Sequence, residues 1–406
     1  MNKNKLRTLI ATTALLAGSA WATDGYFPHG YGMKSLGMGG VSMAMIDNAF
    51  AGANNPATAS FAGNRLDVGV NLFMPRRGAS RTDAGPMNGM VESESPSFIV
   101  PELGYTTQIN DRLAAGVTVY GNGGMNTDYP GGTPNFLAGS GKLGVDMMQL
   151  IVAPTLSYKV DERHAVGVSP LLVYQRFKAQ GLDAFGQMSA DGAHVTGQGY
   201  NSSTGMGVRL GYVGKASELV TLGASWSPKA KMSKFDKYAG LFAGSGGFDI
   251  PENYGVGFAV QATPTLQLAA DYQRINYSGV SSIANPSNNQ APLGSANGPG
   301  FGWSDVNVLK LGAQWQVSSQ WMLRAGYNKT DNPIQVRDVT FNIIAPGVIT
   351  DHYTFGGTYQ FAKDQELTFA YMYAPKVHVE GPGMFGGTEN IHMSQQSIGV
   401  QYGWKF

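Results

Sequence analysis

The chain has 406 residues with 28 Lys and Arg against 27 Asp and Glu, and this near balance excludes nucleic acid as an obvious partner. It contains no cysteine, which excludes disulfides, thiolate metal sites and cysteine nucleophiles. Its 56 glycines, 14% charged and 11% aromatic residues, without a run of about 18 apolar residues after residue 22, indicate a β protein rather than a helical membrane protein.

The first 22 residues have the features of a secretory signal peptide. Lys3, Lys5 and Arg7 form a basic start, residues 9–17 are mostly apolar, and residues 20–22 read Ala-Trp-Ala. An amphipathic N-terminal helix is the alternative, but the apolar run is short and ends in small residues. We therefore predict residues 1–22 to be removed on export, so that the mature chain begins near Thr23.

Residues 23–63 do not alternate and are predicted to form a hatch inside a larger structure. A glycine-rich stretch at 30–40 precedes residues 42–50, which suit a short helix capped by Ser35 or Ser42. About forty residues with so small a core cannot fold alone and must pack on another part of the chain. A flexible external arm is the alternative, although Met and Phe are frequent here and charge is rare.

Residues 64–406 alternate with period two and are predicted to be all-β. One face of each segment is apolar, while the other carries Gly, Thr, Gln and Asn, which could not line a dry core without unpaired polar groups. This pattern is typical of a transmembrane antiparallel barrel with lipid outside and a polar lumen. About fourteen strands are expected, at 65–75, 97–108, 113–122, 147–160, 164–178, 203–213, 218–229, 252–262, 265–278, 305–317, 321–329, 351–361, 366–375 and 395–406.

The connections between these strands alternate in length. Turns of a few residues, such as 110–112 and 161–163, alternate with long loops such as 279–304 and 330–350. Short periplasmic turns, long external loops and an even strand count are typical of barrels of the bacterial outer membrane. The last strand ends in Tyr402, Trp404 and Phe406, and such a terminal aromatic pattern is predicted to be the signal for the barrel-assembly machinery.

Several short motifs occur in this order along the predicted barrel. They are residues 35–40 (Ser-Leu-Gly-Met-Gly-Gly), Asn55-Pro56-Ala57, 116–121 (Gly-Val-Thr-Val-Tyr-Gly), 250–252 (Ile-Pro-Glu) and 321–326 (Trp-Met-Leu-Arg-Ala-Gly). With the predicted signal peptide, hatch and barrel, the chain resembles the FadL/OmpP1/TodX family of outer-membrane transporters. The resemblance covers essentially the whole mature chain and implies a monomer without cofactor or metal.

The resemblance implies passive uptake of a hydrophobic compound, most simply a long-chain fatty acid. The ligand would pass from an external groove to a lumen pocket, and after a hatch movement it would leave sideways beside a kinked third strand. The candidate kink is formed by Gly121, Asn122, Gly123 and Gly124, because such residues allow a bulge. The alternative is that the strand simply ends there.

Three basic residues are candidate ligands for a carboxylate head group. Arg176 lies on the strand from which family members supply an arginine, but strict alternation points it outward, where it would pair with a lipopolysaccharide phosphate instead. Lys310 and Arg324 have lumen parity, and their alternative role is a salt bridge inside the lumen.

Other functions remain as alternatives. Monoaromatic or alkane uptake by the same family needs no basic residue at the ligand, and a hydrophilic porin or a surface adhesin or phage receptor would also use a barrel. Enzyme activity is not indicated, because the six histidines lie in no nucleophile, metal or phosphate motif. The expected partners are a hydrophobic small molecule, outer-membrane lipid and lipopolysaccharide, and the assembly machinery.

Overall fold

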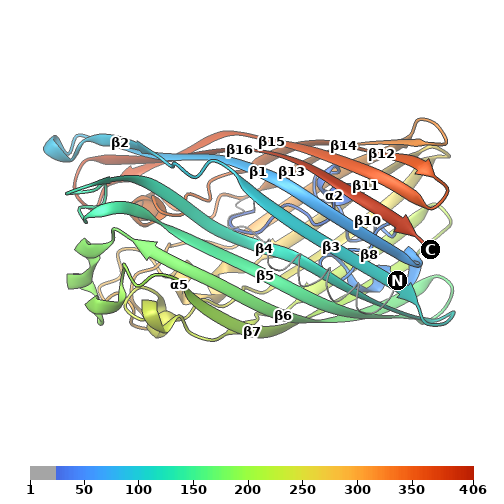
Figure 1. The fold of residues 1–406 in the computed structure, drawn as a ribbon, viewed down its shortest axis with the longest axis horizontal. Helices are drawn as coiled ribbons and strands as arrows, with labels where there is room; N and C mark the ends of the chain where they lie inside the picture. The colour runs from blue at the N-terminus through green and yellow to red at the C-terminus, as the bar shows by residue number, and fades with distance from the viewer. Residues whose placement is uncertain (1–23) are drawn as a thin grey trace.

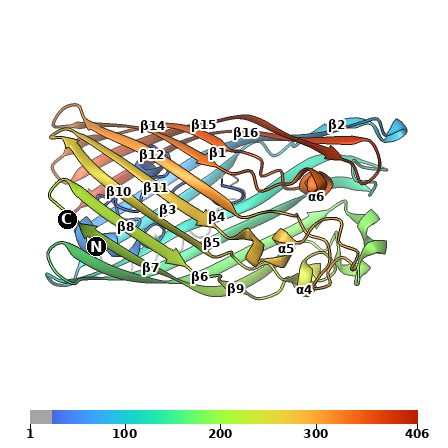
Figure 2. The same cartoon turned by 180° about the vertical axis from the view of Figure 1, so that it is seen from behind.

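The computed structural model describes residues 24–406, which form a closed antiparallel barrel of fourteen strands (Figures 1 and 2). Pairing of the last strand with the first closes the barrel, with Arg65 opposite Lys405. This confirms the predicted fold class, whereas the predicted signal peptide lies outside the described residues. The barrel strands are β1 Arg65–Thr82, β3 Phe98–Gln108, β4 Leu113–Gly132, β5 Gly141–Lys159, β6 His164–Gln180, β7 Asn201–Lys215, β8 Val220–Ser227, β10 Asn253–Thr263, β11 Leu266–Ile275, β12 Val306–Gln316, β13 Trp321–Thr330, β14 Asp351–Ala362, β15 Gln365–Pro382 and β16 Thr388–Lys405.

The remaining elements are short. Strand β2 (Gly89–Glu92) extends a hairpin with β1, and β9 (Lys231–Met232) pairs with β7. Within residues 24–406, none of the helices is long and apolar enough to cross a bilayer. They are α2 Met33–Leu36, η1 Pro56–Thr58, α3 Ala59–Ala62, η2 Gly85–Met87, η3 Asp183–Met188, η4 Gly192–His194, η5 Asp236–Tyr238, α4 Ala243–Gly246, η6 Tyr277–Gly279, α5 Ser281–Ala284, η7 Val336–Asp338 and α6 Val339–Asn342.

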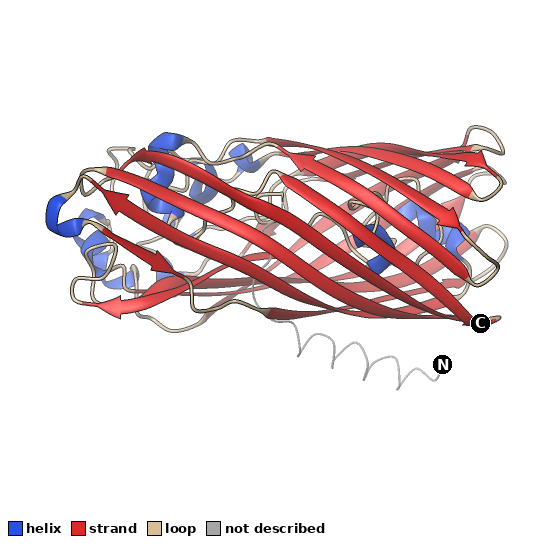
Figure 3. Ribbon diagram, turned by 90° about the horizontal axis from the view of Figure 1, so that it is seen from above, coloured by secondary structure: helices blue, strands red, loops and turns tan. Residues whose placement is uncertain are grey.

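Five strands are much longer than the alternation predicts. Strands β1, β4, β5, β15 and β16 have 18 to 20 residues each and continue beyond the lipid-facing part toward the long loops. There the ladder hydrogen bonds persist although the apolar alternation stops, because backbone pairing needs no apolar face. Most of the helices gather at this end, opposite the C-terminus (Figure 3), and we take it as the extracellular end because the long loops lie there.

The outer face of the barrel is a belt of exposed apolar side chains, as the alternation predicts. Apolar side chains on alternate strand positions reach exposures of 37% to 66%, which is the pattern of a lipid-facing surface. Typical members are Leu172, Met206, Leu222, Phe258, Leu311, Phe355, Phe369 and Val400, with Trp226, Trp315 and Trp321 nearer the strand ends.

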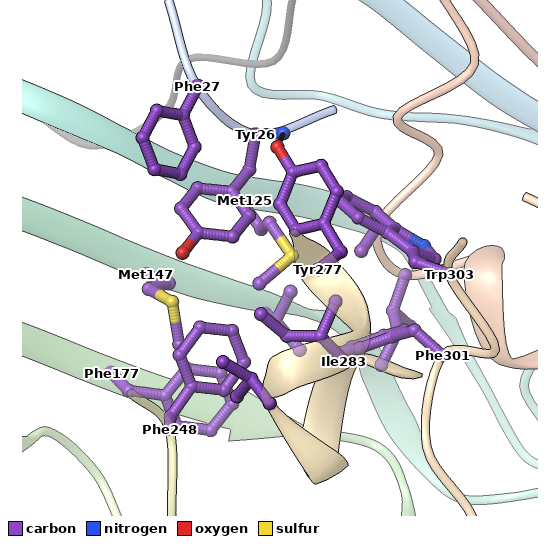
Figure 4. Close-up of a cluster of buried hydrophobic side chains, with 14 of the residues drawn as sticks. Tyr26, Phe27, Met125, Met147, Phe177, Phe248, Tyr277, Ile283, Phe301 and Trp303 are labelled. Atoms are coloured by element: carbon purple, nitrogen blue, oxygen red, sulfur yellow. Dashed lines mark hydrogen bonds between the residues drawn. The ribbon is translucent and has the colours of Figure 1, made fainter. Parts of the chain in front are cut away.

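The lumen is not uniformly polar as predicted, because its two halves differ. The periplasmic half holds the hatch and a network of buried ionic side chains, whereas the extracellular half is filled mainly by one large apolar cluster, with Arg77 and the Arg81–Glu389 ion pair buried beside it. Part of that cluster comes from loops that fold into the barrel, including Tyr277, Ile283, Phe301 and Trp303 (Figure 4). Strand alternation carries no information about inward-folding loops, so the sequence predicted only the polar half.

Residues 24–63 lie inside the barrel and are almost entirely buried. The helix predicted at 42–50 is absent; helix α2 lies before that stretch and follows Gly32 without a side-chain cap from Ser35 or Ser42, and η1 and α3 lie after it. Barrel carboxylates instead accept hydrogen bonds from backbone N–H groups of this stretch. Asp271 Oδ2 accepts one from Ser42 N–H at 2.7 Å and one from Met43 N–H at 3.0 Å. Because these donors are satisfied by the wall, an internal helix is not needed.

Candidate ligand path

An ionic network ties the hatch to the periplasmic end of the barrel. Lys34 Nζ lies 2.9 Å from Glu366 Oε1 and 3.2 Å from Asp47 Oδ2, so one hatch lysine contacts a wall carboxylate and a hatch carboxylate. Arg65 contacts Glu366 and, at 2.7 Å, Asp67. All except Asp47 are almost completely buried, so each charge depends on its partner for stabilisation.

Arg324, a predicted ligand residue, belongs to this network. It donates to Thr358 Oγ1 at 2.6 Å and lies 3.8 Å from Asp47 Oδ2. It lines a pocket at the periplasmic mouth, together with Lys34, Arg65 and Glu366. This position below the hatch matches the salt-bridge alternative for Arg324 and lies away from the apolar half of the lumen.

The Asn55-Pro56-Ala57 motif anchors the hatch to the wall. The Asn55 Nδ2 atom donates to the carbonyl oxygens of Met43 at 2.7 Å and Tyr212 at 2.9 Å, while its Oδ1 accepts from Ala57 N–H at 3.1 Å. Pro56 begins the short helix η1, where a missing N–H costs nothing. One side chain therefore joins the middle of the hatch, its final turn and strand β7.

Lys310 lies on β12 beside the start of the hatch. Burial raises the pKa of the Asp24 carboxyl to about 6, and the nearby Lys310 ammonium opposes that rise. Lys310 also lines a small pocket between the hatch and the wall, with Phe27, Asn54 and Arg209. Its structural environment is thus the hatch interface, as for Arg324.

Arg176 lies on the outward face of β6. The register of β6 with β7 continues without a shift past Arg176, which lies opposite Ser202, so no bulge turns the side chain inward. Its guanidinium lies 4.3 Å above the ring of Tyr200. The structure therefore does not bring Arg176 together with Lys310 and Arg324. Arg176 points away from the lumen in which a head group would bind.

Strand β4 does not end at Gly121 but continues to Gly132 through a bulge. Its register with β5 shifts between Gly121 and Gly123. Asn122 points into the lumen, where it accepts a hydrogen bond from Tyr31 of the hatch and donates one to Gln149, both at 3.0 Å. The glycine-rich segment thus contacts the hatch directly.

The barrel wall is unpaired beside this bulge. Among the described residues, the ladder between β3 and β4 ends at Leu103 opposite Val119, although β4 continues along β5. Pairing to β4 resumes higher up, where Glu94 N–H donates to the Asp128 carbonyl at 2.7 Å. A window bounded by β3 and residues 120–127 of β4 therefore lacks inter-strand hydrogen bonds.

Substituting Gly123 by alanine is expected to displace the hatch. Gly123 has φ +140°, and an added Cβ would lie 2.1 Å from the Tyr26 carbonyl oxygen. The strained backbone and this clash should destabilise the folded barrel by about 1–3 kcal/mol. Urea unfolding of the refolded protein measures the change, with Gly279→Ala as control, since a Cβ there meets nothing within 4 Å. Equal stability of the two variants would contradict the proposed contact.

A small apolar pocket lies next to the window. Its walls come from β1, β4 and β16 and from two loops, and the lining includes the apolar side chains of Phe73, Met125, Trp303 and Met393. Residues 345–347 of the loop before β14 also line it. Met125 and Trp303 also belong to the aromatic cluster of Figure 4, which continues through Tyr26 to Phe177 and Phe248.

One cation, Arg77, lines this pocket and is not among the residues predicted to bind ligand. Arg77 is buried on β1, donates to Ser93 Oγ at 3.0 Å and to the Ser95 carbonyl, and lies 5.5 Å from the centre of the Phe98 ring. Its Nε is buried and makes no hydrogen bond within residues 24–406. Strand β1 was predicted to end at residue 75, which placed Arg77 in a loop. Arg77 is four residues after Phe73, so in a longer strand both side chains point into the lumen, and this spacing is the signal that could have identified Arg77.

The C-terminal aromatic residues lie on the outer face at the periplasmic end. Tyr402 and Phe406 are 37% and 46% exposed, and Trp404 Nε1 donates to Asp364 Oδ2 at 3.3 Å. Their role as an assembly signal remains a prediction. Within residues 24–406, no group of three His, Asp or Glu side chains is arranged to hold a metal ion.

Comparisons with known proteins assign the chain to a family. The family model described as outer membrane protein transport protein (OMPP1/FadL/TodX) matches residues 13–402, while no curated protein sequence matches significantly. Among solved structures, the Pseudomonas putida toluene transporter TodX is 23% identical with a TM-score of 0.70, covering 94% of this chain and 99% of that one.

Two further structures share the fold. A FadL homologue of Pseudomonas aeruginosa is 16% identical with a TM-score of 0.70, covering 94% of this chain and 99% of that one. The Ralstonia pickettii toluene transporter TbuX is 20% identical with a TM-score of 0.66, covering 93% and 99%. The family match spans nearly the whole chain, and this protein therefore belongs to the OMPP1/FadL/TodX family of outer-membrane transporters for hydrophobic compounds.

Proposed function

We propose that this protein admits long-chain fatty acids through the outer membrane. The observation that carries the proposal is an apolar cavity with a buried arginine beside an unpaired window in the wall. Arg77 would bind the carboxylate, and Phe73, Met125 and Met393 would hold the chain. Burial of each CH₂ group contributes about 0.8 kcal/mol, so an alkyl chain gains more from such a cavity than from a water-filled pore.

Release is proposed to occur sideways through the window between β3 and β4. Tyr26 of the hatch meets the bulge at Gly123, and Tyr31 binds Asn122 in the same segment. A shift of the hatch would therefore alter the inner edge of the window and the nearby apolar cluster. The ligand would then enter the lipid phase without crossing the polar periplasmic half of the lumen.

Uptake of labelled oleate and labelled toluene tests the proposal. Cells lacking their own transporter of this family would express either the native chain or a version without residues 23–63. Oleate uptake that depends on the native chain supports fatty-acid transport. Uptake of neither compound, together with passage of small sugars, would contradict it in favour of a porin.

Substituting Arg77 by glutamine is expected to reduce oleate uptake about tenfold or more, because a hydrogen bond to a charged group is lost. Toluene uptake, measured in the same cells, should not change. Arg76→Gln is the matched control, since Arg76 is the adjacent, exposed residue of the same strand. Equal oleate uptake by the Arg77 and Arg76 variants would remove the head-group role.

Monoaromatic hydrocarbon uptake is the second candidate function. Arg77 is already engaged by Ser93, Ser95 and Phe98, which is compatible with a structural role rather than with ligand binding. Two of the solved structures that share the fold are described as toluene transporters. Toluene uptake without oleate uptake would favour this function and leave the hatch and window in the same roles.

A further inference from the structure

A group of cations lies on the outer surface of the barrel, at the extracellular side of β6 and β7. Along the outward face of β6, the exposed residues Leu172 and Tyr174 are followed by Arg176 and Lys178. Both cations face one aromatic ring: the Arg176 guanidinium carbon lies 4.3 Å and the Lys178 Nζ 5.1 Å from the centre of Tyr200. The change from apolar to cationic side chains therefore occurs within one strand.

The change from apolar to cationic side chains on β6 occurs at the expected outer boundary of the membrane. The outward apolar run of β6 begins with Val166 near the periplasmic turn, ten positions before Arg176. At about 3.3 Å per residue and a tilt of about 40°, ten residues rise about 25 Å, which is the height of the apolar band of an outer-membrane barrel. Arg176 thus lies where the acyl chains of the outer leaflet end, with Lys178 just above it.

Two lysines of the neighbouring loop extend the cationic group. Lys237 Nζ donates to the carbonyl oxygens of Gln198 and Tyr200 at 3.3 and 3.2 Å. Lys234 is exposed next to Ser233, whose N–H donates to the Thr204 carbonyl of β7 at 2.8 Å. Together, Arg176, Lys178, Tyr200, Lys234 and Lys237 form what we call the β6 rim patch.

The β6 rim patch has a surplus of positive charge. In the part of the chain that the structure describes, Lys178, Lys234 and Lys237 take part in no ion pair, whereas Lys142, Arg163 and Lys329 lie within 3.2 Å of carboxylates. Exposed cations such as Arg76, Lys229 and Lys376 are also without an ion pair, so the β6 rim patch differs from them in that its cations are grouped. The surrounding segments also carry Asp146, which accepts a hydrogen bond from Tyr200 at 2.5 Å, and the exposed Asp236. Four cations against two carboxylates suit an anionic partner.

We propose that the β6 rim patch binds the phosphorylated head group of lipopolysaccharide. The planar guanidinium of Arg176 can bind two phosphate oxygens, and the lysines supply further positive charge. The acyl chains would then lie along Leu172, Tyr174 and Met206, which are 44%, 39% and 66% exposed. The occupant is a lipid, because the cations continue directly into this apolar surface.

The test measures binding of lipid A to the purified full-length protein in detergent by native mass spectrometry. The probes are bis-phosphorylated lipid A, the same lipid without phosphates, and inorganic phosphate as competitor. Arg176→Gln with Lys178→Gln is expected to weaken lipid A binding about 20-fold, since each cation near an anionic lipid contributes several-fold to affinity. The matched control is Lys142→Gln with Lys329→Gln, which removes two exposed but paired cations.

The outcomes separate a lipid site from a general anion site. Preference for phosphorylated lipid A, lost in the Arg176/Lys178 variant but kept in the control, supports the proposal. Equal binding of both lipids, an unchanged variant, or displacement by inorganic phosphate alone would overturn it. Retention of the folded, heat-modifiable form on gels checks the variant, and Lys234→Gln with Lys237→Gln gives an independent second measurement.

Discussion

A disulfide between residues 37 and 356 is expected to stop uptake. Gly37 of the hatch and Gly356 of β14 face each other so closely that a Cβ on either would lie 3.1 Å from the Cα of the other. Disulfides need Cβ atoms about 3.5–4.5 Å apart. A Cβ at residue 356 would also lie 2.8 Å from the Phe369 carbonyl oxygen, so Gly37→Cys with Gly356→Cys requires the hatch and β14 to move slightly apart. Because the native chain has no cysteine, the bond would form without competing pairs.

Uptake by the oxidised variant should fall to the level of cells without the transporter if release requires the hatch to move against β14. A reducing agent should then restore it in the same cells. The Gly37→Ser/Gly356→Ser variant controls for crowding by the added side chains. Full uptake despite complete disulfide formation would show that this part of the hatch stays in place during transport.

Substituting Glu366 by glutamine is expected to loosen the hatch at its periplasmic end. Glu366 is buried and contacts Lys34 of the hatch and Arg65 of β1. Removing one partner from a buried ion pair costs about 3–5 kcal/mol, because the remaining charge is left uncompensated. Asp47 and Asp67 still face the two cations, so we expect about 3 kcal/mol, near the lower limit of that range.

Thermal unfolding and single-channel conductance in planar bilayers measure this effect. Conductance should increase, since loss of the Lys34 contact frees the hatch beside the pocket at the periplasmic mouth. Glu218→Gln is the control, because Glu218 pairs with Arg163 at 3.2 Å on the surface and is 88% exposed. A Glu366 variant as stable and as closed as this control would show that the network does not hold the hatch.

The barrel itself was predictable from the sequence, because alternation along a strand is a local property. Every predicted strand has a counterpart, and the outward parity of Arg176 is what strict alternation gives. The extra length of β1 was not predictable in this way. Its residues after position 75 interrupt the apolar pattern, yet pairing of Arg77 with Met393 of β16 continues the ladder.

The inside of the barrel was decided by tertiary structure. The hatch contains no helix at 42–50, because barrel carboxylates such as Asp271 bind its backbone N–H groups. The apolar half of the lumen forms when Trp303 and residues 345–347 fold against β1 and β4. Taken alone, the sequence determined which strand faces meet lipid, because contact with the membrane repeats at every second residue of a strand. Contacts between distant loops and strands have no such period. Only the folded chain therefore brings Arg77, Met125 and Trp303 to one cavity.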